Sequence, residues 1–260
     1  MNFKIKKMKK LSFLALFSVI LFSACQQNNS EKVDLSKYPE ALQQVFTKHG
    51  GLEDWSKMNA LTFEIVKEKG NEKHEIDLQD RRDRVEGTNF VLGNDGTNIW
   101  VDADTSYKGN AAFYHNLMFY FYAMPFVLAD DGIIYSEADT LHFEGKSYPG
   151  IHVEFEDGIG QVSTDEYILH YDPETYQMAW LGYTVTYKTK MKSKKFGWIR
   201  YDDWKAVSGF ALPSSMTWYS VENDSIKAPR STREFTNIIV GNRPFSDDVF
   251  EKTENAKIVE

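Results

Sequence analysis

The sequence is almost without cysteine: Cys25 is its only one in 260 residues. A lone thiol excludes an intramolecular disulfide framework and any metal site built from several cysteines. The residues before it are typical of an export signal, with five lysines in Met1–Lys10, an apolar run over Leu11–Phe22, and the small residues Ser23 and Ala24. This order predicts a signal peptide over residues 1–24 and an acylated N-terminus at Cys25.

Long apolar runs are also missing. The run over Leu11–Phe22 is twelve residues long, whereas about 20 predominantly apolar residues are needed to span a bilayer. We therefore expect a lipidated polar tether at 25–33 and a single folded domain at 34–260. An ordinary secretory signal with a coincidental cysteine is the alternative, because Phe22 is an unusual residue three positions before an acylated cysteine. Gln26, in place of Asp, is compatible with the outer membrane, where the domain would face the periplasm.

Positive charge is scarce. After cleavage the chain would keep 25 basic and 38 acidic residues, a net charge of −13. Such a balance argues against nucleic acid and anionic lipid headgroups as partners of the folded body. One exception is the run of five lysines in Lys188–Lys195, which is either a solvated hairpin tip or a contact for phosphates at a membrane surface.

Catalytic and metal-binding motifs are absent as well. The chain has no Gly-x-Ser-x-Gly elbow, no Walker loop and no His-Glu-x-x-His, and its histidines share no metal-ligand spacing. Asp102 and Asp104, with Asn94 and Asp95, are either a solvated turn or a Ca²⁺ site whose spacing fits no calcium loop. Gly158-Ile159-Gly160 reads as a turn. We therefore expect no enzymatic activity, no cofactor and no metal. An envelope hydrolase ranks third, after the two functions that are given at the end of this subsection.

Aromatic residues, in contrast, are abundant at 15% of the chain, and Ala111–Asp130 concentrates them. Helical spacing predicts two apolar stripes there, and a helix that is apolar all round must be buried by protein, lipid or ligand. Pro125 ends or kinks this helix near Met124. His115 inside it is either a hydrogen-bonded core histidine or a polar group that orients a ligand headgroup. The first stripe is Phe113, Leu117, Tyr120, Phe121 and Met124, and the second is Tyr114, Met118 and Tyr122.

The remaining chain alternates with the period of strands. Leu61, Phe63 and Ile65 alternate with polar residues, and so do Ile151, Val153 and Phe155. Helices are expected up to about Lys48 and over Leu52–Met58, and a turn at Ser147–Gly150. Together these features predict an α+β domain with a curved antiparallel sheet. Its further strands are expected at 73–79, 83–88, 98–102, 141–143, 166–171, 177–188, 196–205, 211–221 and 231–240.

Two segments carry a resemblance to a known superfamily. Tyr201–Ser214 (YDDWKAVSGFALPS) and Phe235–Phe250, together with the acylated cysteine and the aromatic segment, resemble the lipoprotein-localisation (LolA/LolB-like) carrier and receptor superfamily. Gly109–Ile134 resembles more narrowly an uncharacterised family of Gram-negative lipoproteins. The resemblance implies an unclosed β-barrel, lidded by helices, that holds acyl chains in an apolar cavity.

On this basis we expect a lipid-anchored, non-enzymatic binding protein of the cell envelope. Its partners would be the membrane, through Cys25, and an apolar ligand such as an acyl chain, a lipid or a lipoprotein. The alternative is a structural or interaction lipoprotein whose filled core holds no ligand. Expected ligand contacts on the lid are Tyr114, His115, Leu117, Met118, Phe121 and Tyr122, and those on the sheet are Phe63, Ile65, Val153 and Phe155.

Overall fold

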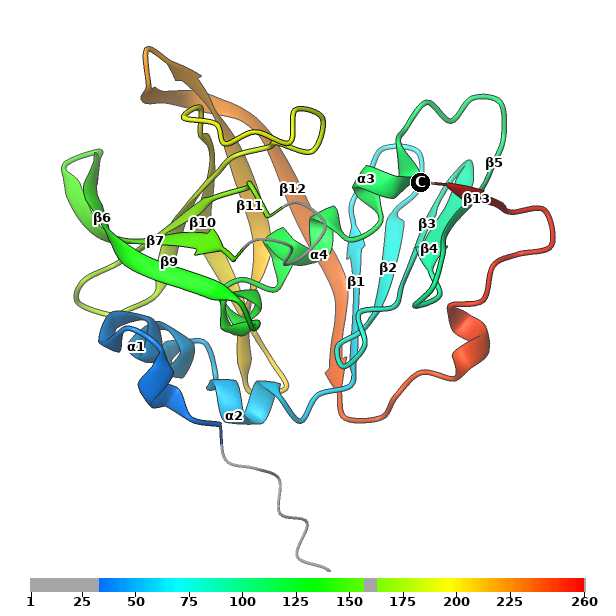
Figure 1. The fold of residues 1–260 in the computed structure, drawn as a ribbon, viewed down its shortest axis with the longest axis horizontal. Helices are drawn as coiled ribbons and strands as arrows, with labels where there is room; N and C mark the ends of the chain where they lie inside the picture. The colour runs from blue at the N-terminus through cyan, green and yellow to red at the C-terminus, as the bar shows by residue number, and fades with distance from the viewer. Residues whose placement is uncertain (1–32, 157–162, 260) are drawn as a thin grey trace, which may run out of the picture. The chain divides into compact units, whose positions relative to one another are not determined.

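The computed structural model describes residues 33–156 and 163–259, so the expected signal peptide, Cys25 and the Gly158–Gly160 turn lie outside the described residues. The described chain forms one 13-stranded antiparallel sheet (Figure 1). Its strands are β1 (Ala60–Ile65), β2 (Glu72–Asp77), β3 (Asp83–Gly87), β4 (Phe90–Asn94), β5 (Ile99–Ala103), β6 (Ile133–Phe143), β7 (Lys146–Phe155), β8 (Tyr167–Tyr171), β9 (Met178–Tyr183), β10 (Gly197–Val207), β11 (Phe210–Glu222), β12 (Ser225–Gly241) and β13 (Lys257–Val259).

The sheet has two arms joined at one ladder. Strands β2 to β5 follow β1 in chain order on one side, and β11 back to β6 follow β12 on the other. The joining ladder pairs β1 with β12, for example Leu61 with Val240, and we call it the seam. The outermost strands, β13 and β6, are not paired with each other in the described part of the chain. The expected curved antiparallel sheet that does not close into a barrel is thus confirmed.

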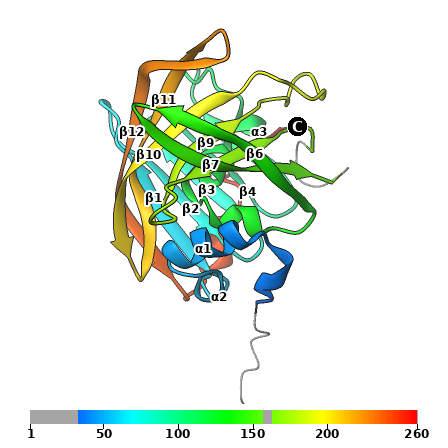
Figure 2. The same cartoon turned by 90° about the vertical axis from the view of Figure 1, so that its left-hand side faces the viewer.

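Helices are few and short. They are η1 (Leu35–Lys37), α1 (Glu40–Lys48), α2 (Leu52–Trp55), α3 (Ala111–Tyr114), α4 (Leu117–Tyr122), η2 (Phe126–Ala129) and η3 (Asp247–Val249). Helices α1 and α2 lie at one end of the strands (Figure 2), where Trp55 of α2 stacks on Phe126 with ring centroids 4.2 Å apart. None of the helices in the described residues is long and apolar enough to cross a membrane.

The aromatic segment is not the single helix that its periodicity predicts. It forms α3, then α4, then the 3₁₀ turn η2, with breaks at His115-Asn116 and at Ala123–Pro125. Asn110 caps α3 by accepting a hydrogen bond from the backbone N–H of Phe113 at 3.1 Å. At the first break the His115 ring lies 2.6 Å from the Asp83 carboxylate on β3, and this contact ties the chain to the sheet.

One expected turn is wrong, and two strands were missed. The segment Ser147–Gly150 is not a turn but part of β7, and the turn between β6 and β7 is Glu144-Gly145, where both residues have positive φ. Pro149 is tolerated in the strand because it faces the register shift between Ala138 and Leu141, where no ladder hydrogen bond is needed from it. Strands β4 and β13 were not expected at all.

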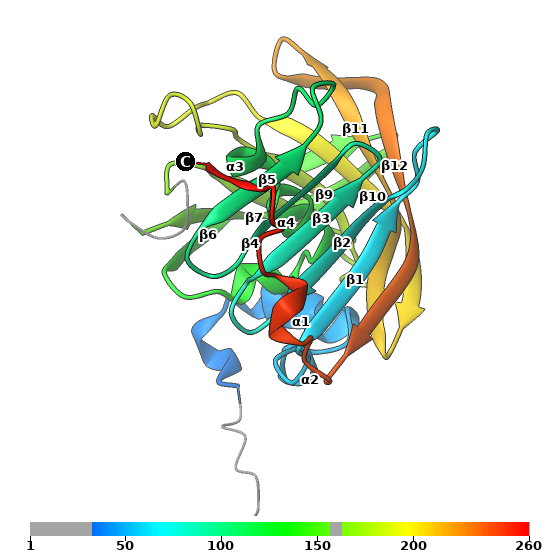
Figure 3. The ribbon, with the colours of Figure 1, turned by 90° about the vertical axis from the view of Figure 1, so that its right-hand side faces the viewer.

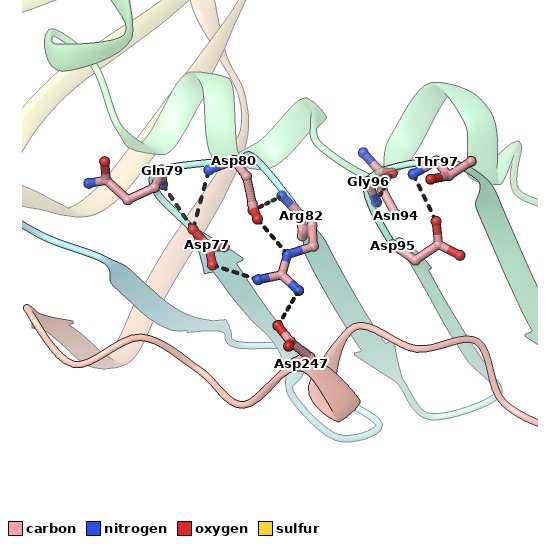
Figure 4. A network of polar contacts seen from close by, with 9 residues as sticks. All are labelled: Asp77, Gln79, Asp80, Arg82, Asn94, Asp95, Gly96, Thr97 and Asp247. Atoms are coloured by element: carbon pink, nitrogen blue, oxygen red, sulfur yellow. Dashed lines mark hydrogen bonds and ion pairs between the residues drawn. The ribbon is translucent and has the colours of Figure 1, made fainter.

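The chain after β12 packs against the outside of the arm that is formed by β1 to β5. Arg82 donates to Asp77 at 3.1 Å and to Asp247 of η3 at 2.8 Å (Figure 4), and its guanidinium lies 4.9 Å from the centre of the Phe250 ring. Trp100 donates its ring N–H to the Phe250 carbonyl at 3.1 Å. Figure 3 shows this segment running from the end of β12 to β5, where β13 adds the outermost strand.

Candidate functional site

A cavity of about 600 Å³ lies between the α3–α4 segment and the strands β9, β11 and β12. Its volume falls within the range of about 300–1,000 Å³ that is usual for small-molecule sites. The lining residues are Lys67, Glu72, Phe90, Tyr107, Gly109, Asn110, Phe113, Tyr114, Leu117, Met118, Phe121, Tyr183, Val185, Trp218, Arg230, Ser231 and Arg233.

Four of the residues expected as lid contacts line this cavity: Tyr114, Leu117, Met118 and Phe121. Phe121 is 4% exposed and is held in place by the sheet, since its ring centre lies 4.9 Å from that of Tyr183 and 6.0 Å from that of Trp218. The cavity therefore has an aromatic and aliphatic side built by α3 and α4. The roles of these residues as ligand contacts stay predictions.

Tyr122, by contrast, lies in the packed core. Its ring stacks on Phe63 at 4.2 Å and contacts Phe235 at 4.7 Å, so that it fills the space behind α4 at the seam. Ile65 and Val153 are fully buried, and neither they nor Phe63 and Tyr122 are among the cavity-lining residues. Phe155 is half-buried against Tyr167, also away from the cavity lining. The structure thus brings four of the six expected lid residues to the cavity, whereas Tyr122 packs in the core with the expected sheet residue Phe63.

A buried carboxylate forms the polar part of the cavity wall. Glu72 is 3% exposed, and its oxygens accept hydrogen bonds from Lys67 at 2.6 Å and from the Tyr114 hydroxyl, and contact His74 at 3.1 Å. Burial alone would raise the pKa of Glu72, but these contacts, led by His74, bring it down to about 2. Glu72 is therefore a charged anchor for Tyr114 on α3.

His115 lies behind this wall and does not line the cavity. It is 4% exposed, and its Nδ1 lies 2.6 Å from Oδ2 of Asp83, which is itself 1% exposed. Burial raises the pKa of Asp83, while the contact with His115 opposes that rise. The pair fixes the break between α3 and α4 over β3, and the role of His115 toward a ligand stays a prediction.

The sheet side of the cavity comes from residues that sequence reasoning missed. Tyr183, Trp218, Arg230 and Arg233 belong to β9, β11 and β12, which lie far from α4 in the sequence. Trp218 could have been found from the sequence, because aromatic residues alternate with polar ones in its strand, and such alternation indicates a buried face. The two arginines gave no local signal, because their place on the cavity depends on how β12 pairs with β11.

The four acidic or amide residues weighed as a calcium site act separately in turns and links. Asp95 accepts from the backbone N–H group of Thr97 at 2.8 Å (Figure 4) and from that of Asn98 at 2.7 Å. Asp102 accepts from the Thr253 hydroxyl at 2.6 Å, and Asp104 accepts from Ser106. Within the described residues, no group of three or more His, Cys, Asp or Glu side chains is placed to hold a metal ion.

Comparisons with known proteins give a family and a set of solved structures. Residues 102–224, slightly less than half of the chain, match a family described as a family of unknown function, DUF6503. None of the curated proteins matches the sequence. The matched segment contains α3, α4 and most of the lining of the cavity.

The solved structures resemble the chain at low sequence identity. A LolA superfamily protein from Nitrosomonas europaea has 9% identity and a TM-score of 0.43, over 75% of this chain and 89% of its own. A DUF1329 family protein from Desulfovibrio piger has 10% identity and a TM-score of 0.46, over 81% and 95%. A domain from Vibrio parahaemolyticus named for outer-membrane lipoprotein sorting has 6% identity and a TM-score of 0.39, over 77% and 91%.

The superfamily that the sequence resembles is thus among the structural neighbours. With TM-scores below 0.5, these likenesses assign no function to the chain.

Proposed function

We propose that this protein is a lipid-anchored binding protein of the cell envelope that holds an apolar ligand, such as an acyl chain, in the cavity beside α3 and α4. The observation that carries the proposal is the cavity of about 600 Å³ lined by Leu117, Met118 and Phe121 of α4 and by Trp218 of β11. An apolar space of this size favours occupation by an apolar molecule, since its lining side chains lack contacts that a ligand would supply.

The anchor in this proposal is acylated Cys25, with the folded domain facing the periplasm from the outer membrane. Its support is the sequence order of lysines, apolar run, small residues and cysteine. A single acyl chain gives only marginal membrane binding, with a constant of about 10⁴ M⁻¹, whereas further chains make the attachment stable. The proposal therefore requires more than one acyl chain at Cys25.

The filled-core alternative has less support. Much of the aromatic surface is covered by protein, as the stacking of Phe63 with Tyr122 shows, but Tyr114 and Leu117 remain only half-buried on the cavity. Protein interiors are close-packed, so a space of this size beside α4 favours a role for these residues beyond packing. The ligand-binding proposal accounts both for the covered aromatic surface and for the half-buried residues on the cavity.

Uptake of a fluorescent fatty acid by a Cys25→Ala form of the full chain tests the proposal. Met118→Ser should weaken uptake, because a hydroxyl without a partner is introduced into the apolar lining. Ile239→Ser is the matched control, since Ile239 is 62% exposed on β12 and lies away from the cavity lining. Native mass spectrometry of the acylated protein should show a copurifying lipid. No uptake by the parent protein, together with no retained lipid, would remove the proposal.

A further inference from the structure

The cavity wall carries an excess of positive charge. Its charged residues are Lys67, Arg230 and Arg233 against Glu72, so that three cations and one carboxylate leave a net charge of +2. The Lys67 ammonium is already paired with Glu72 at 2.6 Å, and the excess therefore resides on the two arginines. This is a local reversal in a chain whose formal net charge is −8.

Both arginines lack the partner that most arginines of this protein have. Neither Arg230 nor Arg233 has a carboxylate within 4 Å among the described residues. Arg243 shares this property but does not line the cavity. The arginines that do pair with carboxylates are Arg81, Arg82, Arg84 and Arg200.

The β11–β12 ladder explains why both side chains reach the cavity. Arg233 is two residues before Phe235, which is buried in the core, so the alternation of a strand gives both residues the same face. Between the pairs Trp218–Ser231 and Tyr219–Pro229, the strand β12 has one extra residue, Arg230. Such a bulge re-aims a side chain, and here Arg230 joins Ser231 and Arg233 on the lining.

The charges lie close to the aromatic side of the cavity. Burial raises the pKa of Tyr114, and the positive charge of Arg233 acts against this rise. Arg230 does the same for Tyr183, whose pKa is likewise raised by burial. The positive charge of each guanidinium therefore acts on a tyrosine of the cavity lining.

The approach to the cavity is basic too. The loop between β9 and β10 carries Lys188–Lys195, and its Tyr187 ring lies 5.2 Å from that of Phe113 on the cavity wall. Lys192 is paired with Glu154 and Glu166, whereas the other lysines of the run have no carboxylate within 4 Å in the described chain. Their field would draw an anion toward the cavity.

We propose that the ligand is an amphiphile with an acyl chain and an anionic headgroup, a carboxylate or a phosphate. Its chain would lie along Leu117, Met118 and Phe121, and its headgroup would face Arg230 and Arg233. Arginine suits both headgroups, because its planar donors bind carboxylate and phosphate in the same forked geometry. This inference rests on the proposed function, since it names the chemical class of the ligand for the same cavity.

The test compares three amphiphiles that share one palmitoyl chain and differ in the headgroup. Palmitate, palmitoyl lysophosphatidate and the uncharged monopalmitoylglycerol compete with a fluorescent fatty acid for the Cys25→Ala full chain. Both anions should bind about tenfold more tightly than the uncharged compound, as expected from two partly exposed arginine contacts. The preference should shrink as the salt concentration rises. Whichever anion binds more tightly identifies the headgroup as a carboxylate or a phosphate.

Variants of the arginines supply the second part of the test. The double variant Arg230→Gln/Arg233→Gln should bind all three compounds as weakly as the parent binds monopalmitoylglycerol. Arg230→Lys/Arg233→Lys should keep part of the preference because it keeps the charge. Arg243→Gln is the matched control and should change nothing. Circular dichroism checks that the variants remain folded, which their exposed positions favour.

The outcomes separate the two proposals. Equal binding of charged and uncharged compounds, or a double variant that behaves like the parent, would overturn the headgroup inference and leave the binding cavity intact. Displacement of the probe by inorganic phosphate alone would also overturn it, because the acyl chain would then contribute nothing. If none of the three amphiphiles binds, the proposed function fails, and the inference fails with it.

Discussion

The His49 side chain should make the stability of the domain fall between pH 7.5 and pH 5.0. His49 follows α1 and is fully buried, with Nδ1 3.2 Å from the Ala211 carbonyl and Nε2 3.1 Å from the backbone nitrogen of Met178. A backbone N–H can only donate, so Nε2 is an acceptor and Nδ1 holds the proton. The site therefore fits a neutral imidazole. Burial lowers the pKa of His49 to about 4, against a weaker opposing effect of the Ala211 hydrogen bond.

The sign and size follow from this depressed pKa. In the unfolded chain the pKa of His49 is 6.5. Below pH 6.5 the unfolded state therefore binds a proton at His49, whereas the folded state keeps the imidazole neutral until the pH approaches 4. The contribution of His49 to stability is thus present above pH 6.5 and is lost as the pH falls toward 4. At pH 5.0 the free energy of unfolding should be lower than at pH 7.5 by about 2 kcal/mol from this residue.

Urea unfolding of the Cys25→Ala form at the two pH values measures the effect. His49→Gln will be less stable at both pH values, because the hydrogen bonds of the buried imidazole are disturbed, but the loss of stability between pH 7.5 and pH 5.0 should shrink by about 2 kcal/mol. His170, whose pKa burial also lowers to about 4, is present in both proteins and cancels in the comparison. The exposed His142→Gln is the control and should keep the full loss. An equal loss in the parent and in His49→Gln would refute the reasoning.

Three further changes test other parts of the structure. Met124→Ala should lower the free energy of unfolding by about 2–5 kcal/mol, the usual range for a buried core methionine. Leu117→Ala should lower it by clearly less, because Leu117 lies on the cavity wall. Similar losses for the two variants in urea unfolding would contradict the separation of wall from core. Arg82→Gln should speed hydrogen exchange at Lys257–Val259, because it breaks the ion pair with Asp247, whereas Arg84→Gln should leave this exchange unchanged. Unchanged exchange in Arg82→Gln would show that the pairing of β13 with β5 does not depend on this ion pair. Cys25→Ala should release the protein from the membrane fraction, and continued membrane attachment of a cleaved form would disprove the anchor.

Strands with clean alternation were predictable from sequence because burial imposes it. Leu61, Phe63 and Ile65 are all fully buried, as their period of two indicates. β4 was missed because Gly93 and Asn94 look like turn residues. Gly93 instead allows close packing: a Cβ there would lie 2.8 Å from the Trp100 ring and 2.5 Å from the Asp83 carbonyl oxygen. That requirement exists only once β3, β4 and β5 are assembled.

The cavity was half predictable. The residues Leu117, Met118 and Phe121 stand out because a segment so apolar must be covered on every side. Which strand covers it depends on pairing between distant segments, and a bulge at Arg230 that turns one side chain leaves no trace in local composition. The break at His115 was hidden for a similar reason, since its partner Asp83 lies on a strand 32 residues earlier.

The seam between β1 and β12 has a consequence for how the chain reaches this fold. Apart from β13, each arm is built from strands that are neighbours in sequence, which pair quickly because little chain must be ordered to bring them together. The pairing of Leu61 with Val240 must wait until nearly the whole described chain is available. Until then Phe63 and Phe235, which meet at 5.6 Å across the finished seam, are uncovered beside two unpaired strand edges.

Unpaired apolar strand edges of this kind favour pairing with another copy of the chain. A substitution at the seam should therefore lower the yield of folded protein by more than its effect on the completed domain suggests.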